Sequence, residues 1–102
     1  MANIDIVRKV DANGIESVQF DPPRLQVGVG ESIFFRNRDN KAQHWITRKG
    51  KSQDFWFRSA LAPYTGEPPD VSSEIVFQSD PGEDITYACS LHPGEEGVIA
   101  VG

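Results

Sequence analysis

Residues 80–94 of the chain read Asp80-Pro81-Gly82-Glu83-Asp84-Ile85-Thr86-Tyr87-Ala88-Cys89-Ser90-Leu91-His92-Pro93-Gly94. Ile85, Tyr87 and Cys89 alternate with other residues, which places the three on one face of a β-strand. Because Ile85 and Tyr87 are large, we expect that face to lie in the core, with Cys89 pointing inward at the end of the strand. The Pro93-Gly94 turn is expected to fold His92 back beside the sulfur.

The second histidine, His44, lies 45 positions before Cys89, at the start of another predicted strand. Ile46 shares its face of that strand, so a two-sheet sandwich could bring His44 to the same end of the molecule as Cys89 and His92. A thiolate and two imidazoles form a borderline-soft donor set that suits copper, and zinc also binds such a set. Both histidines and the only cysteine are therefore candidates for one metal site.

Short apolar alternations recur through the rest of the chain, separated by turns rich in Gly, Pro and Asn. They predict seven or eight strands, at residues 4–10, 18–20, 25–29, 32–36, 44–47, 73–77, 84–89 and 98–101. This spacing indicates an all-β fold, an antiparallel two-sheet Greek-key sandwich. Residues 51–70 differ from the predicted strands, because an aromatic run is followed by a loop rich in Pro, Gly and acidic residues. A short helix is expected near 54–62. The aromatic run Phe55-Trp56-Phe57 is expected to cover the core.

The composition sets limits on what the chain can be. Its 102 residues, 38% hydrophobic and 25% charged, predict a single domain spanning residues 1–102. The net charge of −5 and the scattered basic residues argue against nucleic acid as a partner. No run of 18 apolar residues is present, so no membrane span is expected. A single cysteine cannot form an internal disulfide, so Cys89 must have a role other than cross-linking the chain.

The chain resembles the cupredoxins, the small blue copper proteins of the plastocyanin, pseudoazurin and amicyanin type. Residues 80–94 look like the ligand hairpin of that family, in which Tyr, Cys and His recur at this spacing. Residues 20–37 look like the strand and turn that precede the first ligand. The resemblance implies a cupredoxin-like sandwich in which His44, Cys89 and His92 are the equatorial ligands of one copper ion.

The same resemblance implies a function and a compartment. The copper ion would cycle between Cu(II) and Cu(I), and electrons would pass through the exposed edge of His92 to a redox partner protein docking around Leu91 and Pro93. The chain is then an electron carrier and not an enzyme. Export to a periplasm or a similar space is expected, although residues 1–5 carry neither the basic nor the apolar region of a signal peptide.

The sequence departs from the family at the axial position. Most members carry methionine three to five positions after the second histidine, but here those positions are Glu95, Glu96 and Gly97, and the only methionine is Met1. Glu95 is a candidate axial ligand, a hard oxygen donor that favours Cu(II) and lowers the reduction potential. The alternatives are a three-coordinate site, an axial water, or the Gln43 carbonyl. Glu96 is expected to face solvent.

Two further departures concern the loops that hold the ligands. The family commonly has Asn just after the first histidine, where it ties the two ligand loops together, and this chain has Trp45. Several relatives have proline two positions after the cysteine, where this chain has Leu91, which keeps its N–H. A hydrogen bond from that N–H to the sulfur would raise the potential, in opposition to an axial carboxylate.

Other functions fit parts of the same pattern. A copper ion with an open or carboxylate-bound position could react with a small molecule such as nitric oxide or peroxide. The chain could also carry copper without a redox role, or be a metal-free sandwich used for protein contact. Hydrolysis by a Cys–His pair is disfavoured, because Cys89 faces inward and no third group is evident to orient a histidine. Each candidate ligand has an ordinary structural explanation when taken singly, and their joint spacing favours copper.

Overall fold

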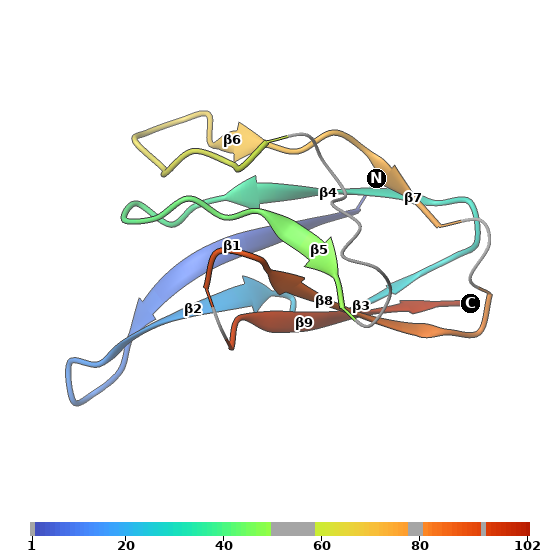
Figure 1. The fold of residues 1–102 in the computed structure, drawn as a ribbon, viewed down its shortest axis with the longest axis horizontal. Helices are drawn as coiled ribbons and strands as arrows, with labels where there is room; N and C mark the ends of the chain where they lie inside the picture. Colours follow the sequence, from blue (N-terminus) through green and yellow to red (C-terminus); the bar gives the residue numbers. More distant parts are fainter. Residues whose placement is uncertain (1, 50–58, 78–80, 93) are drawn as a thin grey trace.

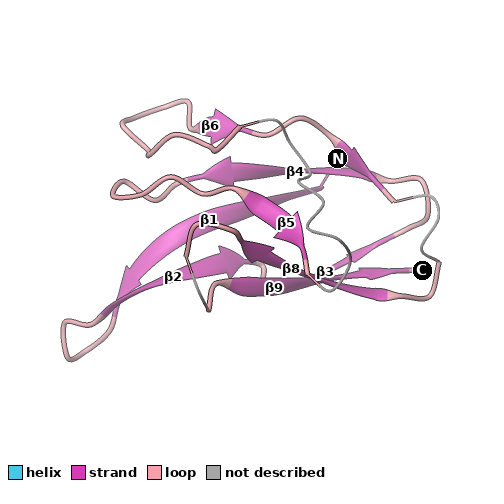
Figure 2. Ribbon diagram, in the orientation of Figure 1, coloured by secondary structure: helices cyan, strands magenta, loops and turns pink. Residues whose placement is uncertain are grey.

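The computed structural model describes residues 2–49, 59–77, 81–92 and 94–102 (Figure 1). Strands joined by loops make up this part of the chain, as Figure 2 shows. The strands are β1 Ala2–Val10, β2 Glu16–Asp21, β3 Arg24–Val27, β4 Ser32–Asn37, β5 Ile46–Arg48, β6 Asp70–Val71, β7 Ile75–Val76, β8 Asp84–Cys89 and β9 Glu96–Val101. Within the described ranges, no segment forms an apolar helix of membrane-spanning length.

The strands form two sheets that enclose a common core, which confirms the expected all-β sandwich. One sheet has the order β2-β1-β4-β6, with β7 also paired to β4, and the other has the order β3-β9-β8-β5 (Figure 1). The sheets are mixed and not purely antiparallel as expected, because β1 pairs with β4 and β3 with β9 in parallel. Parallel partners are joined by long connections, so no turn in the sequence marks them.

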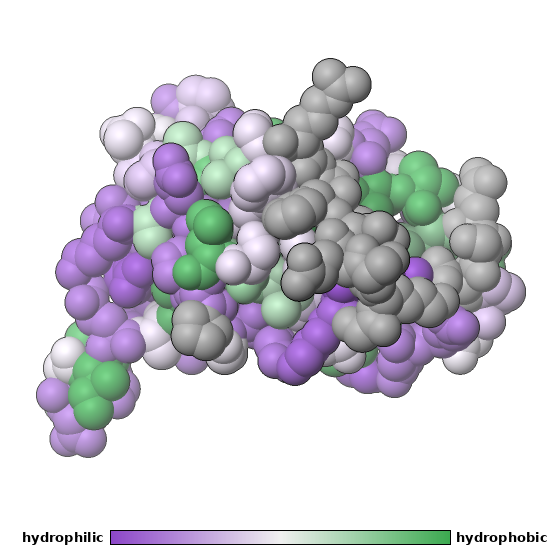
Figure 3. Space-filling model, in the orientation of Figure 1, coloured by the Kyte–Doolittle hydropathy of each residue, from purple (hydrophilic) through white to green (hydrophobic). Residues whose placement is uncertain are grey.

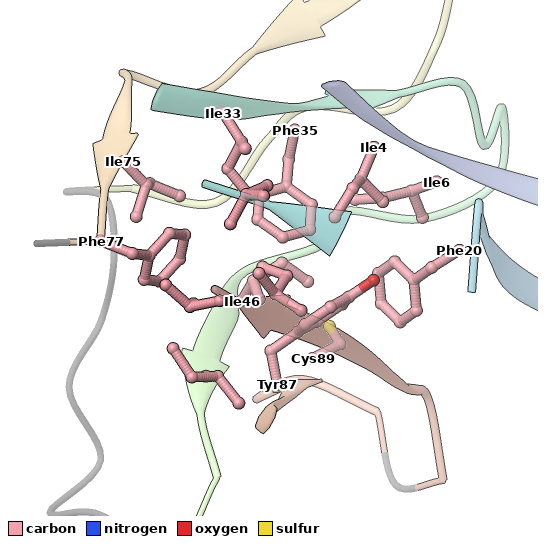
Figure 4. Packing of buried hydrophobic residues seen from close by; sticks show 14 of the residues in the cluster. Ile4, Ile6, Phe20, Ile33, Phe35, Ile46, Ile75, Phe77, Tyr87 and Cys89 are labelled. Carbon is pink, nitrogen blue, oxygen red and sulfur yellow. The ribbon is translucent and has the colours of Figure 1, made fainter. Parts of the chain in front are cut away.

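Apolar residues at every second position fill the space between the sheets. The buried apolar residues of strands β1, β4 and β8 are Ile4, Ile6, Ile33, Phe35, Ile85, Tyr87 and Cys89. Figure 4 shows Phe20, Phe35 and Tyr87 meeting in this core. The ring centroids of Phe20 and Tyr87 are 4.9 Å apart and those of Phe35 and Tyr87 are 5.2 Å apart, both edge to face. The edge-to-face packing of Tyr87 therefore holds β8 in place two residues before Cys89, the last residue of the strand.

Strand β9 makes room for the largest of these side chains. Gly97 lies opposite Tyr87 in the β8–β9 pairing. A Cβ atom at Gly97 would collide with the ring and hydroxyl of Tyr87. Glycine at this position thus lets Tyr87 be completely buried beside the strand that leads away from the loop of residues 90–95.

The described part of the predicted helix, residues 59–62, is not helical. Leu61 forms an antiparallel bridge with His44, in which the Leu61 N–H donates to the His44 carbonyl at 2.8 Å and the His44 N–H to the Leu61 carbonyl at 3.2 Å. This long-range pairing outweighs the local pattern on which the helix prediction depended. Residues 54–58, including the aromatic run, lie outside the described residues.

The face of the molecule in Figure 3 is largely hydrophilic. Apolar surface is visible at the tip of the β1–β2 hairpin, where Val10 and Ile15 are exposed, and in other separate areas of this face. Single exposed apolar residues are ordinary on protein surfaces. Among the residues that the structure describes, a core of large apolar side chains lies between the sheets, and a cluster of His, Cys and Glu side chains, described next, adjoins it.

Candidate metal centre

His44 lies just before strand β5, and Cys89 is the last residue of the neighbouring strand β8. The β5–β8 pairing sets Ile46 opposite Cys89, and His44 lies two residues before Ile46. His44 is fully buried and Cys89 is 4% exposed. The inward orientation predicted for Cys89 is confirmed, and Figure 4 shows its sulfur at the edge of the core. Sheet pairing thus brings together two residues that are far apart in the sequence.

The loop between β8 and β9 carries His92 and Glu95. It is closed by the Cys89 N–H, which donates to the Glu95 carbonyl at 3.1 Å. The N–H and hydroxyl of Ser90 both donate to the Trp45 carbonyl, at 2.8 and 2.9 Å. The tether between the two ligand loops, which Asn provides in the family, is therefore made here by Ser90 and the Trp45 backbone.

Four side chains converge at this end of the sandwich, those of His44, Cys89, His92 and Glu95. One potential ligand atom from each lies within 4.8 Å of the others. Cys89 Sγ is 3.4 Å from His92 Nδ1. Glu95 Oε1 is 3.1 Å from His44 Nδ1 and 3.4 Å from His92 Nδ1. The structure thus brings together all four residues that the sequence singled out as candidate ligands.

Two atoms of this cluster are buried without a hydrogen-bond partner. They are His44 Nδ1 and Glu95 Oε1, which lie 3.1 Å apart without the alignment of a hydrogen bond. Buried polar atoms in folded proteins nearly always have a partner. A cation between these two atoms would satisfy both, and Cys89 and His92 would complete its coordination. The residues present therefore fit a metal ion.

The chemistry of the donors narrows the choice of metal. One sulfur and two imidazole nitrogens suit copper or zinc, whereas magnesium and calcium prefer shells of oxygen atoms. Glu95 adds a single carboxylate to the three softer donors. The cluster therefore fits copper or zinc and does not resemble a site for a hard cation.

Asp39, which the sequence did not single out, lies behind His44. Its Oδ2 atom is 2.8 Å from His44 Nε2, on the side of the imidazole away from Glu95. Arg8 binds the same carboxylate with two hydrogen bonds, from Nε to Oδ1 at 2.7 Å and from Nη2 to Oδ2 at 2.9 Å. A lone acid in a turn is usually solvated, and its position five residues before His44 is the only hint in the sequence.

The Asp39 carboxyl is ionised at neutral pH. Burial raises its pKa, but hydrogen bonds from Arg8, His44 and the Lys41 amide outweigh burial and lower the pKa from 3.8 to about 2. An ionised carboxylate only accepts hydrogen bonds, so His44 Nε2 carries the shared proton. In the neutral imidazole, Nδ1 then keeps its lone pair and faces Glu95 Oε1 as a second acceptor. A bound cation would relieve this opposition.

The Cys89 thiol experiences two opposing effects. Burial, together with the nearby Glu95 carboxylate, raises the pKa of the thiol above its ordinary value, although hydrogen bonds from the backbone amides of Trp45, Leu91 and His92 act to lower it. The contact expected from the Leu91 N–H is among them. Amide donors stabilise the thiolate, which is the form that binds metals. The loop thus partly prepares the sulfur for coordination.

Comparison with known proteins places this arrangement in a structural family. No family model and no curated protein matches the chain. Among solved structures, a purple cupredoxin from Nitrosopumilus maritimus matches with a TM-score of 0.67 and 24% identity, covering 100% of both chains. Amicyanin from Paracoccus versutus matches with a TM-score of 0.68 and 16% identity, covering 99% of this chain and 80% of the other. The chain has the cupredoxin fold.

The cupredoxin resemblance of residues 80–94 is thereby confirmed at the level of the fold. A reduced Cu(I) form of an amicyanin variant gives a TM-score of 0.70 at 16% identity, covering 99% of this chain and 81% of the other. The copper named there belongs to that amicyanin. In this cupredoxin-fold chain, the four candidate donors fit copper or zinc.

The side chains of the loop between β8 and β9 differ in how far they are exposed to solvent. The side chain of Glu95 is 15% exposed, whereas that of Glu96 is 40% exposed and pairs with Lys49 at the surface. Glu96 thus faces solvent as expected. His92 is 36% exposed and Leu91 is 46% exposed. These two side chains form the solvent-facing side of the cluster.

Proposed function

We propose that this cupredoxin-fold protein binds one copper ion and carries single electrons by cycling between Cu(II) and Cu(I). His44, Cys89 and His92 are the equatorial ligands, and Glu95 is the axial ligand. The observation that carries the proposal is the convergence of these four donors within 4.8 Å, with His44 Nδ1 and Glu95 Oε1 buried and unpaired. The likeness to an amicyanin described with Cu(I) supports copper over zinc.

The chain's own residues hold the donors in place. The bridge between His44 and Leu61 and the β5–β8 pairing position His44 and Cys89. The hydrogen bonds of Ser90 to the Trp45 carbonyl position the loop that carries the other two donors. Bound copper supplies the one-electron couple. Close packing around the donors limits the change in coordination between oxidation states, so little rearrangement accompanies electron transfer.

Electrons enter and leave at the exposed side of the site. His92 is the only one of the two histidines that reaches the surface in the described structure, with Leu91 exposed beside it. A redox partner protein would dock over these two residues, while His44 stays in the interior. In this role the protein is a carrier and not an enzyme. From the family resemblance we also propose export to a periplasm, which fractionation of the producing cells tests.

A second candidate function follows from the partial exposure of Glu95. Its side chain is 15% exposed although the Oε1 atom is buried, so part of the side chain borders solvent while the atom that faces the cluster does not. If the carboxylate moved aside, a small molecule such as nitric oxide or peroxide could take its place. The protein would then perform small-molecule copper chemistry instead of, or beside, electron transfer.

The absorption and paramagnetic resonance spectra of the Cu(II)-loaded protein distinguish these functions. An electron carrier is expected to show an intense sulfur-to-copper band and reversible reduction to Cu(I). Addition of azide or nitric oxide is expected to leave its spectrum unchanged. A spectrum that changes on addition favours the small-molecule function. A protein that binds no copper, or binds it without reversible reduction, contradicts electron transfer.

Replacement of the sulfur tests the ligand assignment. Cys89→Ser is expected to abolish the intense visible band, because the thiolate is the charge-transfer donor, and to leave the fold intact, because Cys89 forms no disulfide. The visible spectrum and far-ultraviolet circular dichroism report these two properties. Thr86→Ser, which changes a residue on the opposite face of β8, serves as a matched control and is expected to retain the band. A band that persists in Cys89→Ser contradicts the assignment.

A further inference from the structure

The Asp39 carboxylate is held in one orientation by contacts on both oxygens. Oδ1 accepts hydrogen bonds from Arg8 Nε at 2.7 Å and from the Lys41 N–H at 2.9 Å. Oδ2 accepts from Arg8 Nη2 at 2.9 Å and lies 2.8 Å from His44 Nε2. Asp39 is fully buried, and the side chain of Arg8 is 21% exposed. The side chains of Arg8, Asp39 and His44 therefore form a hydrogen-bonded chain, the Arg8–Asp39–His44 relay, which extends from the surface to the buried imidazole.

The turn that contains Asp39 is held mainly by a different residue. Asn37 Nδ2 donates to the carbonyls of Ala42, Leu61 and Ala62, at 3.0, 3.2 and 2.9 Å. Asn37 Oδ1 accepts the Asp39 N–H at 2.9 Å. The backbone is thus fixed by an amide side chain. The Asp39 carboxylate instead binds Arg8, His44 and one backbone amide. These contacts indicate that it orients the imidazole of His44.

A buried carboxylate has two effects on a histidine that ligates a metal. It holds the proton on the far nitrogen, so that the near nitrogen is free to bind, and it increases the electron density that the ring donates. Greater donation stabilises the higher charge of Cu(II) more than that of Cu(I). Pairing with Arg8 offsets the cost of burying the charge and limits its effect on the ring.

We propose that Asp39 is a positioning residue of the copper centre, which holds His44 with Nδ1 directed at the metal and biases the centre toward Cu(II). This inference rests on the proposed function of the four-donor site. Arg8 holds the buried carboxylate in one orientation with two hydrogen bonds. The Arg8–Asp39–His44 relay thereby sets the reduction potential from a position that does not touch the metal.

The tautomer of His44 tests the positioning role without any metal. In metal-free, ¹⁵N-labelled protein at neutral pH, a long-range ¹H–¹⁵N spectrum is expected to show the His44 proton on Nε2, slow to exchange with water. The chain has only two histidines, so loss of one set of signals in His92→Gln assigns the other to His44. A proton on Nδ1 in the unmodified protein overturns the proposal, and this measurement requires no Asp39 variant to fold.

The reduction potential tests the electronic role. In Asp39→Asn the charge is lost at nearly constant volume, and Cu(II) binding is expected to weaken relative to Cu(I) binding by about tenfold, which is about 59 mV for a one-electron couple. Asp84→Asn is the matched control, because Asp84 pairs with Arg24 at the surface, where both side chains are 58% exposed. The control is expected to leave the potential unchanged.

The two measurements separate this inference from the proposed function. An unchanged potential in folded Asp39→Asn overturns the electronic role, as does an equal shift in Asp84→Asn. If the unmodified protein binds no copper, the proposed function fails, while the tautomer of His44 still decides whether Asp39 positions the ring. A purely structural Asp39 would change the stability of the protein and neither the tautomer nor the potential.

Discussion

Glu95 and Glu96 are adjacent in the sequence and lie in different surroundings, with Glu95 beside His44 Nδ1 and Glu96 paired with Lys49. In Glu95→Met, a thioether replaces an anionic oxygen, and the reduction potential of the copper protein is expected to rise because Cu(II) loses its hard donor. Glu96→Met is the matched control and is expected to keep the potential. Voltammetry measures both, and an unchanged potential in Glu95→Met would place Glu95 outside the coordination sphere.

Gly97 illustrates a residue that is required for its lack of a side chain. Gly97→Ala sets a Cβ atom against the buried ring of Tyr87, so the free energy of unfolding is expected to fall by about 1–3 kcal/mol. Gly102→Ala is the control, because its added Cβ would meet atoms no closer than 3.9 Å. Urea unfolding measures both variants. Equal stability of the two would show that β8 and β9 separate easily at this point.

At the scale of single residues, what the sequence reveals depends on how rare the residue type is. One cysteine and two histidines stand out, and the spacing of Cys89 and His92 with the following turn predicted their proximity. Asp39 is one of 15 acidic residues in the chain, and nothing local distinguishes a buried acid from a solvated one. Its role depends on Arg8, 31 positions away. Contacts of that kind follow from the fold and not from a local pattern.

Strand β8 joins the core to the candidate metal site, and its two faces are expected to tolerate substitution differently. Ile85→Ala removes a core side chain that is 1% exposed and is expected to cost about 2–5 kcal/mol of unfolding free energy. Thr86→Ala, on the opposite face, is expected to cost less than about 1 kcal/mol. Thermal or urea unfolding measures both. Similar losses for the two variants would contradict the alternation from which the orientation of Cys89 was predicted.

At the scale of elements, strands with a clear alternation were predictable and their partners were not. The predictions at residues 32–36 and 84–89 correspond closely to β4 and β8. The two-residue strand β6 at Asp70–Val71 is too short to show a period and was not predicted. The pairing of Leu61 with His44 and the parallel neighbours β1 and β4 join distant segments. These pairings depend on the packing of the whole sandwich, and a short stretch of sequence carries no information about that packing.

At the scale of the whole molecule, acid is expected to destabilise the metal-free protein through Asp39. Its pKa is lowered from 3.8 to about 2, so its contribution to stability is present above about pH 4 and is lost as the pH falls toward 2. The loss corresponds to about 2 kcal/mol. Urea unfolding between pH 5 and 2 measures it. Asp39→Asn is the comparison and is expected to show a shallower dependence on pH. Equal slopes would contradict the contribution of Asp39.

The order of the four donors along the chain has a consequence for biosynthesis. Strands β1, β2 and β4 lie within residues 2–37, and β1 pairs with both β2 and β4, so the centre of one sheet is synthesised before Cys89. Three of the four donors lie between residues 89 and 95. Until these three residues have been synthesised, His44 is the only one of the four candidate donors in the chain. If the four donors bind copper as proposed, the complete site exists only after residue 95 has been synthesised, and a chain stopped before Cys89 would lack three of the four donors.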